Sequence, residues 1–163
     1  MARNRPAEAD PPLQSRPMPS RPFHILLVCT GNTCRSPMAE VIARQLIGES
    51  GRNLSVSSAG TAAMDGDEAS PEAVVAMAAQ GLDLERHRAR QLTADLAQKA
   101  DVIWAMTGAH AAAAMRLAPN AKPERLDPAR DIPDPFGRSL EVYEDTAEAI
   151  REALSLRLRK IEK

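Results

Sequence analysis

The stretch that decides the fold is residues 24–37, which read His-Ile-Leu-Leu-Val-Cys-Thr-Gly-Asn-Thr-Cys-Arg-Ser-Pro. Its first half is an apolar run that predicts a buried strand over about 23–29. Its end, Ser36 followed by Pro37, is typical of a helix start, because a hydroxyl can cap the first turn and proline suits the first helical position. The stretch therefore predicts a strand, a turn and a helix, and the helix is expected to bury Met38, Val41, Ile42 and Leu46.

The same alternation of strand and helix continues along the chain. It predicts an α/β fold of the Rossmann-like kind, a four-stranded parallel sheet with helices on both faces. An irregular loop with three prolines is expected over 127–137. The other expected elements are strands over 53–58, 101–106 and 124–126, helices over 70–81, 93–99 and 108–117, and a last helix that carries Leu140, Tyr143, Ala147, Ile150, Leu154, Leu158 and Ile161 at three- and four-residue steps.

The first 22 residues differ from the rest in composition. They contain six prolines and four arginines and almost no apolar periodicity. Such a segment buries too little surface to offset the entropy of ordering it. We therefore predict a disordered tail over 1–22 and a single domain over 23–163.

Overall composition excludes several classes of partner. The 163 residues carry 21 basic and 22 acidic side chains, so the net charge of −1 gives no attraction for nucleic acid or an anionic membrane. No apolar stretch approaches the ~20 residues that span a bilayer. Two cysteines and three dispersed histidines are too few for a structural metal site. We expect a cytoplasmic monomer without a metal or other cofactor.

The turn after the first strand has the spacing of a loop that holds and attacks a phosphate. Cys29 is the candidate nucleophile, and the helix N-terminus and Arg35 both favour its thiolate. Gly31 and Asn32 tolerate the left-handed backbone that turns successive N–H groups inward. Arg35 offers a planar fork that matches two phosphate oxygens. Ser36 has two compatible roles, to cap the helix and to donate its hydroxyl to the Cys29 sulfur.

Cys34 and the three histidines have either a structural or a functional role. Cys34 is either a structural thiol or the partner of Cys29 in a reversible disulfide that protects the nucleophile from over-oxidation. For His24, His87 and His110 we favour an ordinary structural role, filling space or capping a helix.

These residues resemble the low-molecular-weight protein-tyrosine-phosphatase family, whose signature Cys-x-Gly-Asn-x-Cys-Arg-Ser-Pro is carried by residues 29–37. The resemblance extends to Ser-Ser-Ala-Gly-Thr at 57–61, His-Arg-Ala-Arg-Gln-Leu at 87–92 and Asp-Pro-Phe at 134–136. It implies a four-stranded parallel sheet, a cysteinyl-phosphate intermediate, a phosphorylated protein as substrate and no metal. It also implies that Asn32 supports the loop through contacts near Ser58. The residues expected to bind the substrate or its phosphate are Thr30, Gly31, Asn32, Thr33, Cys34, Ser36 and Phe136.

A general acid is needed to protonate the leaving group. From the residues alone, Asp127, Asp131 and Asp134 are all candidates in the proline-rich loop. The resemblance implies Asp134, the aspartate of Asp-Pro-Phe.

Two residues bear on the substrate. Thr33 stands where many tyrosine-directed members have a bulky aliphatic residue, and Gly137 replaces the second residue of an aromatic pair. In both respects the chain is similar to the bacterial protein-arginine-phosphatase branch, in which the threonine is linked to phosphoarginine selectivity. The Thr33 hydroxyl can orient the hydrolytic water, or it only satisfies loop hydrogen bonds. Phosphotyrosine is the alternative substrate. An arsenate reductase or a non-catalytic phosphate-binding module fits less well, since no cysteine follows Cys34 and a module needs no nucleophile.

Overall fold

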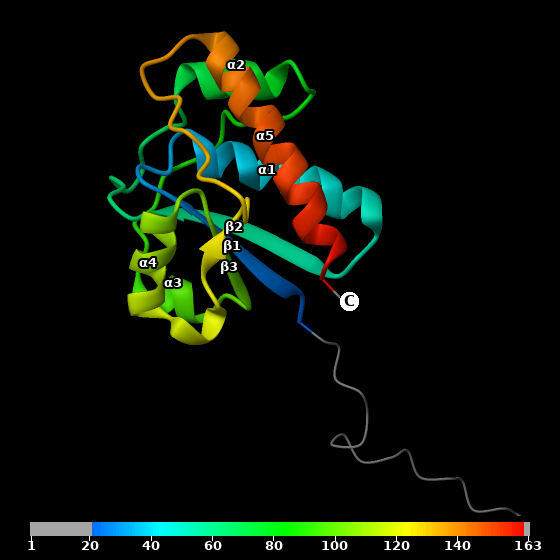
Figure 1. The fold of residues 1–163 in the computed structure, drawn as a ribbon. Coiled ribbons are helices and arrows are strands. Elements are labelled where there is room, and N and C mark those ends of the chain that lie inside the picture. Colours follow the sequence, from blue (N-terminus) through cyan, green and yellow to red (C-terminus); the bar gives the residue numbers. More distant parts are fainter. Residues whose placement is uncertain (1–20, 162–163) are drawn as a thin grey trace, which may run out of the picture.

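The computed structural model describes residues 21–161, so the part of the predicted tail over 1–20 lies outside the described residues. Its centre is a four-stranded sheet in the order β2-β1-β3-β4, and every pair of neighbours is parallel. Figure 1 shows the long pair β1 and β2 beside the shorter β3. The predicted parallel α/β sheet is confirmed. The strands are β1 (Phe23–Cys29), β2 (Leu54–Gly60), β3 (Val102–Ala105) and β4 (Glu124–Arg125).

Helices cover both faces of the sheet, as predicted. On one face α1, α2 and α5 pack together, and on the other α3 and α4 lie against β1 and β3 (Figure 1). A short 3₁₀ helix, Pro119–Ala121, leads into β4. The α-helices are α1 (Arg35–Ser50), α2 (Pro71–Ala78), α3 (Ala94–Gln98), α4 (Gly108–Leu117) and α5 (Leu140–Arg159).

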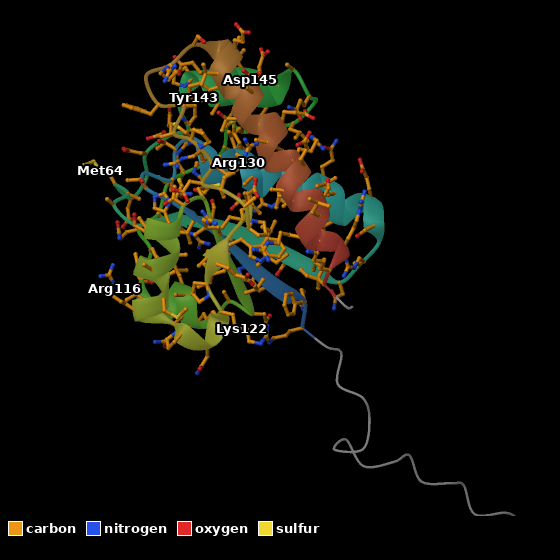
Figure 2. All side chains as sticks on the ribbon, in the orientation of Figure 1. Met64, Arg116, Lys122, Arg130, Tyr143 and Asp145 are labelled. Atoms are coloured by element: carbon orange, nitrogen blue, oxygen red, sulfur yellow. The ribbon has the colours of Figure 1, made fainter. Side chains whose placement is uncertain are left out.

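The alternation of side chains along β1 builds two hydrophobic cores. Ile25 and Leu27 point toward α1 and α5, whereas Leu26 and Val28 point toward α3 and α4. All four are almost completely buried, which is why this strand has no polar alternation in its sequence. Figure 2 shows side chains filling the space between the sheet and its helices, with Met64 projecting away from them.

Several details differ from those predicted, and β3, β4 and α3 are each one or two residues shorter than expected. The capping residue of α1 is Cys34, which makes no side-chain cap, so the prediction that Ser36 caps this helix is wrong. The Ser36 hydroxyl contacts the Cys29 sulfur instead. Leu46 is only half-buried, and Ile47 takes the core position. Strand β2 runs on to Gly60, because pairing with β1 continues up to Cys29 opposite Gly60. Helices α2 and α5 end earlier than predicted, at Ala78 and Arg159.

The strand order places a ligand site at the end of β1. The chain goes from β1 to a neighbour on one side, β2, and later to one on the other side, β3. Ligands of open parallel sheets bind beyond the carboxyl ends of the strands at such a switch point. Cys29 is the last residue of β1, and the N-terminus of α1 starts six residues later. The fold therefore brings a thiol and a helix N-terminus to the expected place.

Candidate active site

A cavity of about 210 Å³ lies at the carboxyl end of β1. Two segments form it: the nucleophile loop, residues 29–36, and the acid loop, residues 127–137. The structure brings together in this cavity most of the predicted site residues, although the two loops are separated by about ninety positions. Asn32, Ser36 and Ser58 lie behind it, and the residues that line it are Cys29, Thr30, Gly31, Thr33, Cys34, Arg35, Asp134 and Phe136.

The thiol of Cys29 is buried and has one hydroxyl beside it. Its Sγ lies 2.8 Å from the Oγ of Ser36. The side-chain amide of Asn32 donates to the same Oγ at 2.8 Å. Because the serine oxygen accepts this bond, its own hydrogen is left to point at the sulfur. The serine hydroxyl can therefore donate a hydrogen bond to the Cys29 sulfur.

Asn32 is the centre of the hydrogen-bond network behind the loop. It has a left-handed backbone, with φ of 55°, and no exposed surface. Its side-chain nitrogen also donates to Ser58 Oγ at 2.9 Å, and its side-chain oxygen accepts the backbone N–H of Arg90 at 3.0 Å. The His87 ring Nε2 donates to its carbonyl at 2.7 Å. Every polar group of the asparagine side chain is therefore used to fix the loop.

Gly60 holds the end of β2 against the nucleophile loop. A β-carbon at this position would lie 2.3 Å from the Thr30 carbonyl oxygen and 2.9 Å from the Asn32 nitrogen. Both neighbours are backbone atoms and cannot move aside without distorting the loop. Sequence reasoning included Gly60 only as a letter of the 57–61 segment and did not identify this close approach.

Arg35 connects the two loops. Its side chain is only about 5% exposed, and one Nη donates to the Ile132 carbonyl at 2.9 Å. The other Nη lies 3.8 Å from the Asp134 carboxylate. The guanidinium is therefore held at the wall of the cavity. It is planar, and such a group can bind two oxygens of a phosphate.

The structure distinguishes the three aspartates of the acid loop. Asp127 accepts the Ala129 N–H and pairs with Arg130, and Asp131 accepts the Gly108 N–H at the start of α4. Neither lines the cavity. Asp134 does, and its side chain is 55% exposed, so this carboxyl can reach a bound substrate.

Cys34 contacts a buried phenol. Its Sγ lies 3.3 Å from the hydroxyl of Tyr143 on α5 and 3.4 Å from the hydroxyl of Ser70. Burial and the bond to Cys34 raise the pKa of Tyr143 to about 12. Figure 2 shows Tyr143 on the part of α5 next to α2. Cys29 and Cys34 are both free thiols here, and the disulfide between them stays a prediction.

Two of the three histidines contact the nucleophile loop, and these contacts were not predicted from the sequence. His87 holds the Asn32 carbonyl, as described above. His110, in the first turn of α4, has its Nε2 2.7 Å from the Thr30 hydroxyl. Burial, with the nearby Arg35 charge, lowers the pKa of His110 to about 4, so the ring is neutral near pH 7. His24 lies away from the site and contacts two serines of β2, Ser55 and Ser57.

Two further findings concern the part of the chain that the structure describes. Within residues 21–161, no three His, Cys, Asp or Glu side chains lie together as ligands for a metal ion. Among the same residues, no helix combines the length and the apolar character needed to cross a membrane.

Comparison with known proteins agrees with this geometry. The family model described as low molecular weight phosphotyrosine protein phosphatase matches residues 24–163. A probable low molecular weight protein-tyrosine-phosphatase, EpsP of Ralstonia nicotianae, is 39% identical over 78% of this chain and 88% of its own. The protein-arginine-phosphatase of Bacillus subtilis is 35% identical over 85% and 97%. A solved structure of the YwlE arginine phosphatase, a cysteine-to-serine mutant with a phosphorylated active-site serine, superposes with a TM-score of 0.78 at 33% identity, covering 84% and 96%. The chain belongs to the low molecular weight phosphotyrosine protein phosphatase family.

Proposed function

We propose that the protein is a cysteine-dependent phosphatase that hydrolyses phosphoarginine in proteins. The observation that carries the choice of substrate is the position of Thr33, which lines the cavity together with Cys29, Arg35 and Asp134. A hydroxyl at this place can orient a water molecule toward a phosphorylated cysteine, whereas an aliphatic side chain cannot. The 35% identity to a protein named as a protein-arginine-phosphatase supports the same choice.

In the first step the Cys29 thiolate attacks the phosphorus atom and an S–P bond forms. The P–N bond breaks, and its electron pair goes to the guanidine nitrogen, which receives a proton from Asp134. Arg35 and the inward N–H groups of the loop bind the phosphoryl oxygens. The products of this step are an arginine side chain and cysteinyl phosphate.

In the second step water hydrolyses the intermediate. The Asp134 carboxylate takes a proton from the water while its oxygen attacks phosphorus, and Thr33 orients that water. The S–P bond breaks and the electron pair returns to Cys29, where the Ser36 hydroxyl stabilises the thiolate. Inorganic phosphate is released. The phosphorylated serine in the YwlE mutant structure is a covalent phosphoryl group at an active-site residue of a relative, and it supports this scheme.

The test compares hydrolysis of phosphoarginine and phosphotyrosine peptides of the same sequence, with Cys29→Ser as the blank. We expect the wild type to prefer phosphoarginine. Thr33→Ile is expected to lower that preference by about tenfold or more, and Thr33→Ser, which keeps the hydroxyl, to retain it. If Thr33→Ile leaves the ratio of phosphoarginine to phosphotyrosine hydrolysis unchanged, Thr33 does not determine the choice of substrate. Rapid acid quenching is expected to trap phosphate on Cys29, which a non-catalytic binding module cannot form.

Phosphotyrosine is the second candidate substrate, and one observation favours it. Phe136 lies at the cavity and is 71% exposed, so it offers an apolar ring face on which an aromatic side chain can stack. The 39% identical relative is named a probable tyrosine phosphatase. If phosphotyrosine is the better substrate of the wild type, the arginine assignment is wrong and the two-step chemistry remains. The monomeric state and the cytoplasmic location stay predictions from the sequence.

A further inference from the structure

One hydrogen-bonded chain of side chains reaches the cavity from α4 and has no part in the scheme above. It runs from Thr107, the capping residue of α4, through His110 to Thr30. The Thr107 hydroxyl lies 3.0 Å from His110 Nδ1, and His110 Nε2 lies 2.7 Å from the Thr30 hydroxyl. Thr30 lines the cavity directly after the nucleophile, while His110 is 7% exposed and does not line it.

The partners of Thr107 favour one tautomer of the histidine. Its oxygen accepts the backbone N–H of His110 at 3.2 Å as the helix cap. Its hydroxyl hydrogen then has Nδ1 as an acceptor, and no other acceptor for it is found among the described residues. A neutral ring that accepts at Nδ1 carries its hydrogen on Nε2. This hydrogen points at the Thr30 oxygen.

The tautomer of His110 determines where the hydroxyl hydrogen of Thr30 points. Because the Thr30 oxygen accepts from His110, its own hydrogen is not used in that bond and can turn into the cavity. We propose that His110 is a positioning residue that makes Thr30 a hydrogen-bond donor to a phosphoryl oxygen of the substrate. The inference rests on the proposed phosphatase function, but it does not depend on whether arginine or tyrosine carries the phosphate.

Charge around the ring is consistent with this role. Burial and the charge of Arg35 lower the pKa of His110, whereas Asp131 and Asp134 raise it. The effect of burial is the largest, so the neutral imidazole is favoured. A neutral ring has one donor and one acceptor, which are the two groups that the chain from Thr107 to Thr30 requires. A charged ring would present two donors, and the Thr107 hydroxyl would lose its acceptor.

The first test is kinetic and uses Thr30→Val, His110→Ala and their double variant. Each single variant is expected to lower kcat/KM by about tenfold, with the loss of one hydrogen bond to a charged oxygen. The double variant is expected to lose no more than either one, because both remove the same donor. Thr30→Ser and His110→Gln, which keep a hydroxyl and a side-chain donor, are expected to stay close to wild type. If the loss of kcat/KM in the double variant equals the product of the losses in the two single variants, the proposal is wrong.

Two readouts separate positioning from general damage. The inhibition constant of inorganic phosphate is expected to rise about tenfold in Thr30→Val and in His110→Ala, equally whichever substrate is used. Nitrogen-15 NMR of the wild type is expected to show His110 protonated at Nε2, and protonation at Nδ1 would overturn the proposal. His24→Ala, which removes a half-buried histidine outside the cavity, is the control and is expected to leave the phosphate constant unchanged.

The outcomes for the wild type distinguish the two claims. If the wild type neither hydrolyses phosphorylated peptides nor binds inorganic phosphate, the proposed function fails and this inference fails with it. If the wild type does both and the Thr30 and His110 variants match it, only the role of His110 is wrong.

Discussion

The nucleophile loop and the acid loop form the same cavity but are built differently. In the nucleophile loop Cys29, Asn32 and Ser36 are buried, and the polar side chains of the last two are fully engaged. In the acid loop the chemistry-bearing side chains are open to solvent, with Asp134 55% and Phe136 71% exposed. The first loop is therefore preorganised by its neighbours, whereas the second presents groups that a substrate can still reorient.

The acid loop is nevertheless attached to the rest of the domain, and two of its attachments involve residues just before Asp134. Arg35 donates to the Ile132 carbonyl, and Asp131 accepts the N–H of Gly108. Both anchors lie within three residues of Asp134. The position of the Asp134 carboxyl is therefore set by attachments of its loop rather than by burial of its own side chain.

The largest effect is expected from a change of Arg35, which lies in the nucleophile loop and contacts the acid loop. Arg35→Lys keeps the charge and removes the planar fork together with the second donor. We expect kcat/KM to fall by about 10³-fold, since the substitution affects phosphate binding and the anchor at Ile132. Arg44→Lys is the matched control, because Arg44 lies on the same helix, is largely exposed and forms an ion pair with Glu40. Equal activity of the two variants would contradict the role given to Arg35.

A second prediction concerns the exposed acid. Asp134→Asn is expected to lower kcat by about 10²-fold and to leave the melting temperature unchanged, because this side chain packs little. The loss is expected to shrink with aryl phosphates whose leaving groups need no proton. Asp127→Asn and Asp131→Asn test the other two carboxylates of the loop. If either of these variants loses more kcat than Asp134→Asn, Asp134 is not the general acid.

A third prediction tests the rigidity of the nucleophile loop. Gly60→Ala places a methyl group against the Thr30 carbonyl, and we expect it to lower the free energy of unfolding by about 1 to 3 kcal/mol. Activity is expected to fall by roughly tenfold, because the loop must shift. Gly48→Ala is the control, since a β-carbon there has no atom within 4 Å and alanine favours the helix. Denaturant unfolding and steady-state kinetics of both variants measure these effects.

A fourth prediction concerns the dependence of stability on pH, for which we expect little or no effect on activity near neutral pH. His110 has a folded-state pKa of about 4, below its ordinary value, because of burial and Arg35. Between about pH 6.5 and pH 4 the unfolded chain binds the proton and the folded chain does not, so stability falls as pH falls through this window. His110 accounts for up to about 3 kcal/mol of this loss. His110→Gln is expected to flatten the curve of unfolding free energy against pH, and a curve parallel to the wild type would contradict the prediction.

How much of this was predictable depends on how far apart the interacting residues lie in the sequence. The strand, turn and helix around Cys29 are local, and the apolar run and the spacing predict them well. The capping role of Ser36 was wrong because two side chains, Asn32 and Cys29, compete for the same hydroxyl. A local pattern cannot decide that competition.

Contacts between distant segments were the part that the sequence did not reveal. His87 and His110 contact the nucleophile loop across 55 and 80 positions. The family resemblance includes His87 in the segment 87–92, but neither contact was predicted. The three aspartates of the acid loop have similar surroundings in the sequence, and resemblance to the family singled out Asp134. In the structure Asp134 lines the cavity, whereas Asp127 and Asp131 accept hydrogen bonds away from it.

The first described residue, Arg21, lies near the start of β1, at the end of the sheet away from the cavity. Its guanidinium makes two 2.8 Å bonds to the Asp101 carboxylate, just before β3, whereas the cavity lies beyond Cys29 at the other end of β1. Seven residues of extended strand span about 20 Å. A surface, a fluorophore or a fusion partner tethered ahead of Arg21 therefore joins the domain on the side opposite the active site. Such a tether leaves the entrance open to a folded protein substrate.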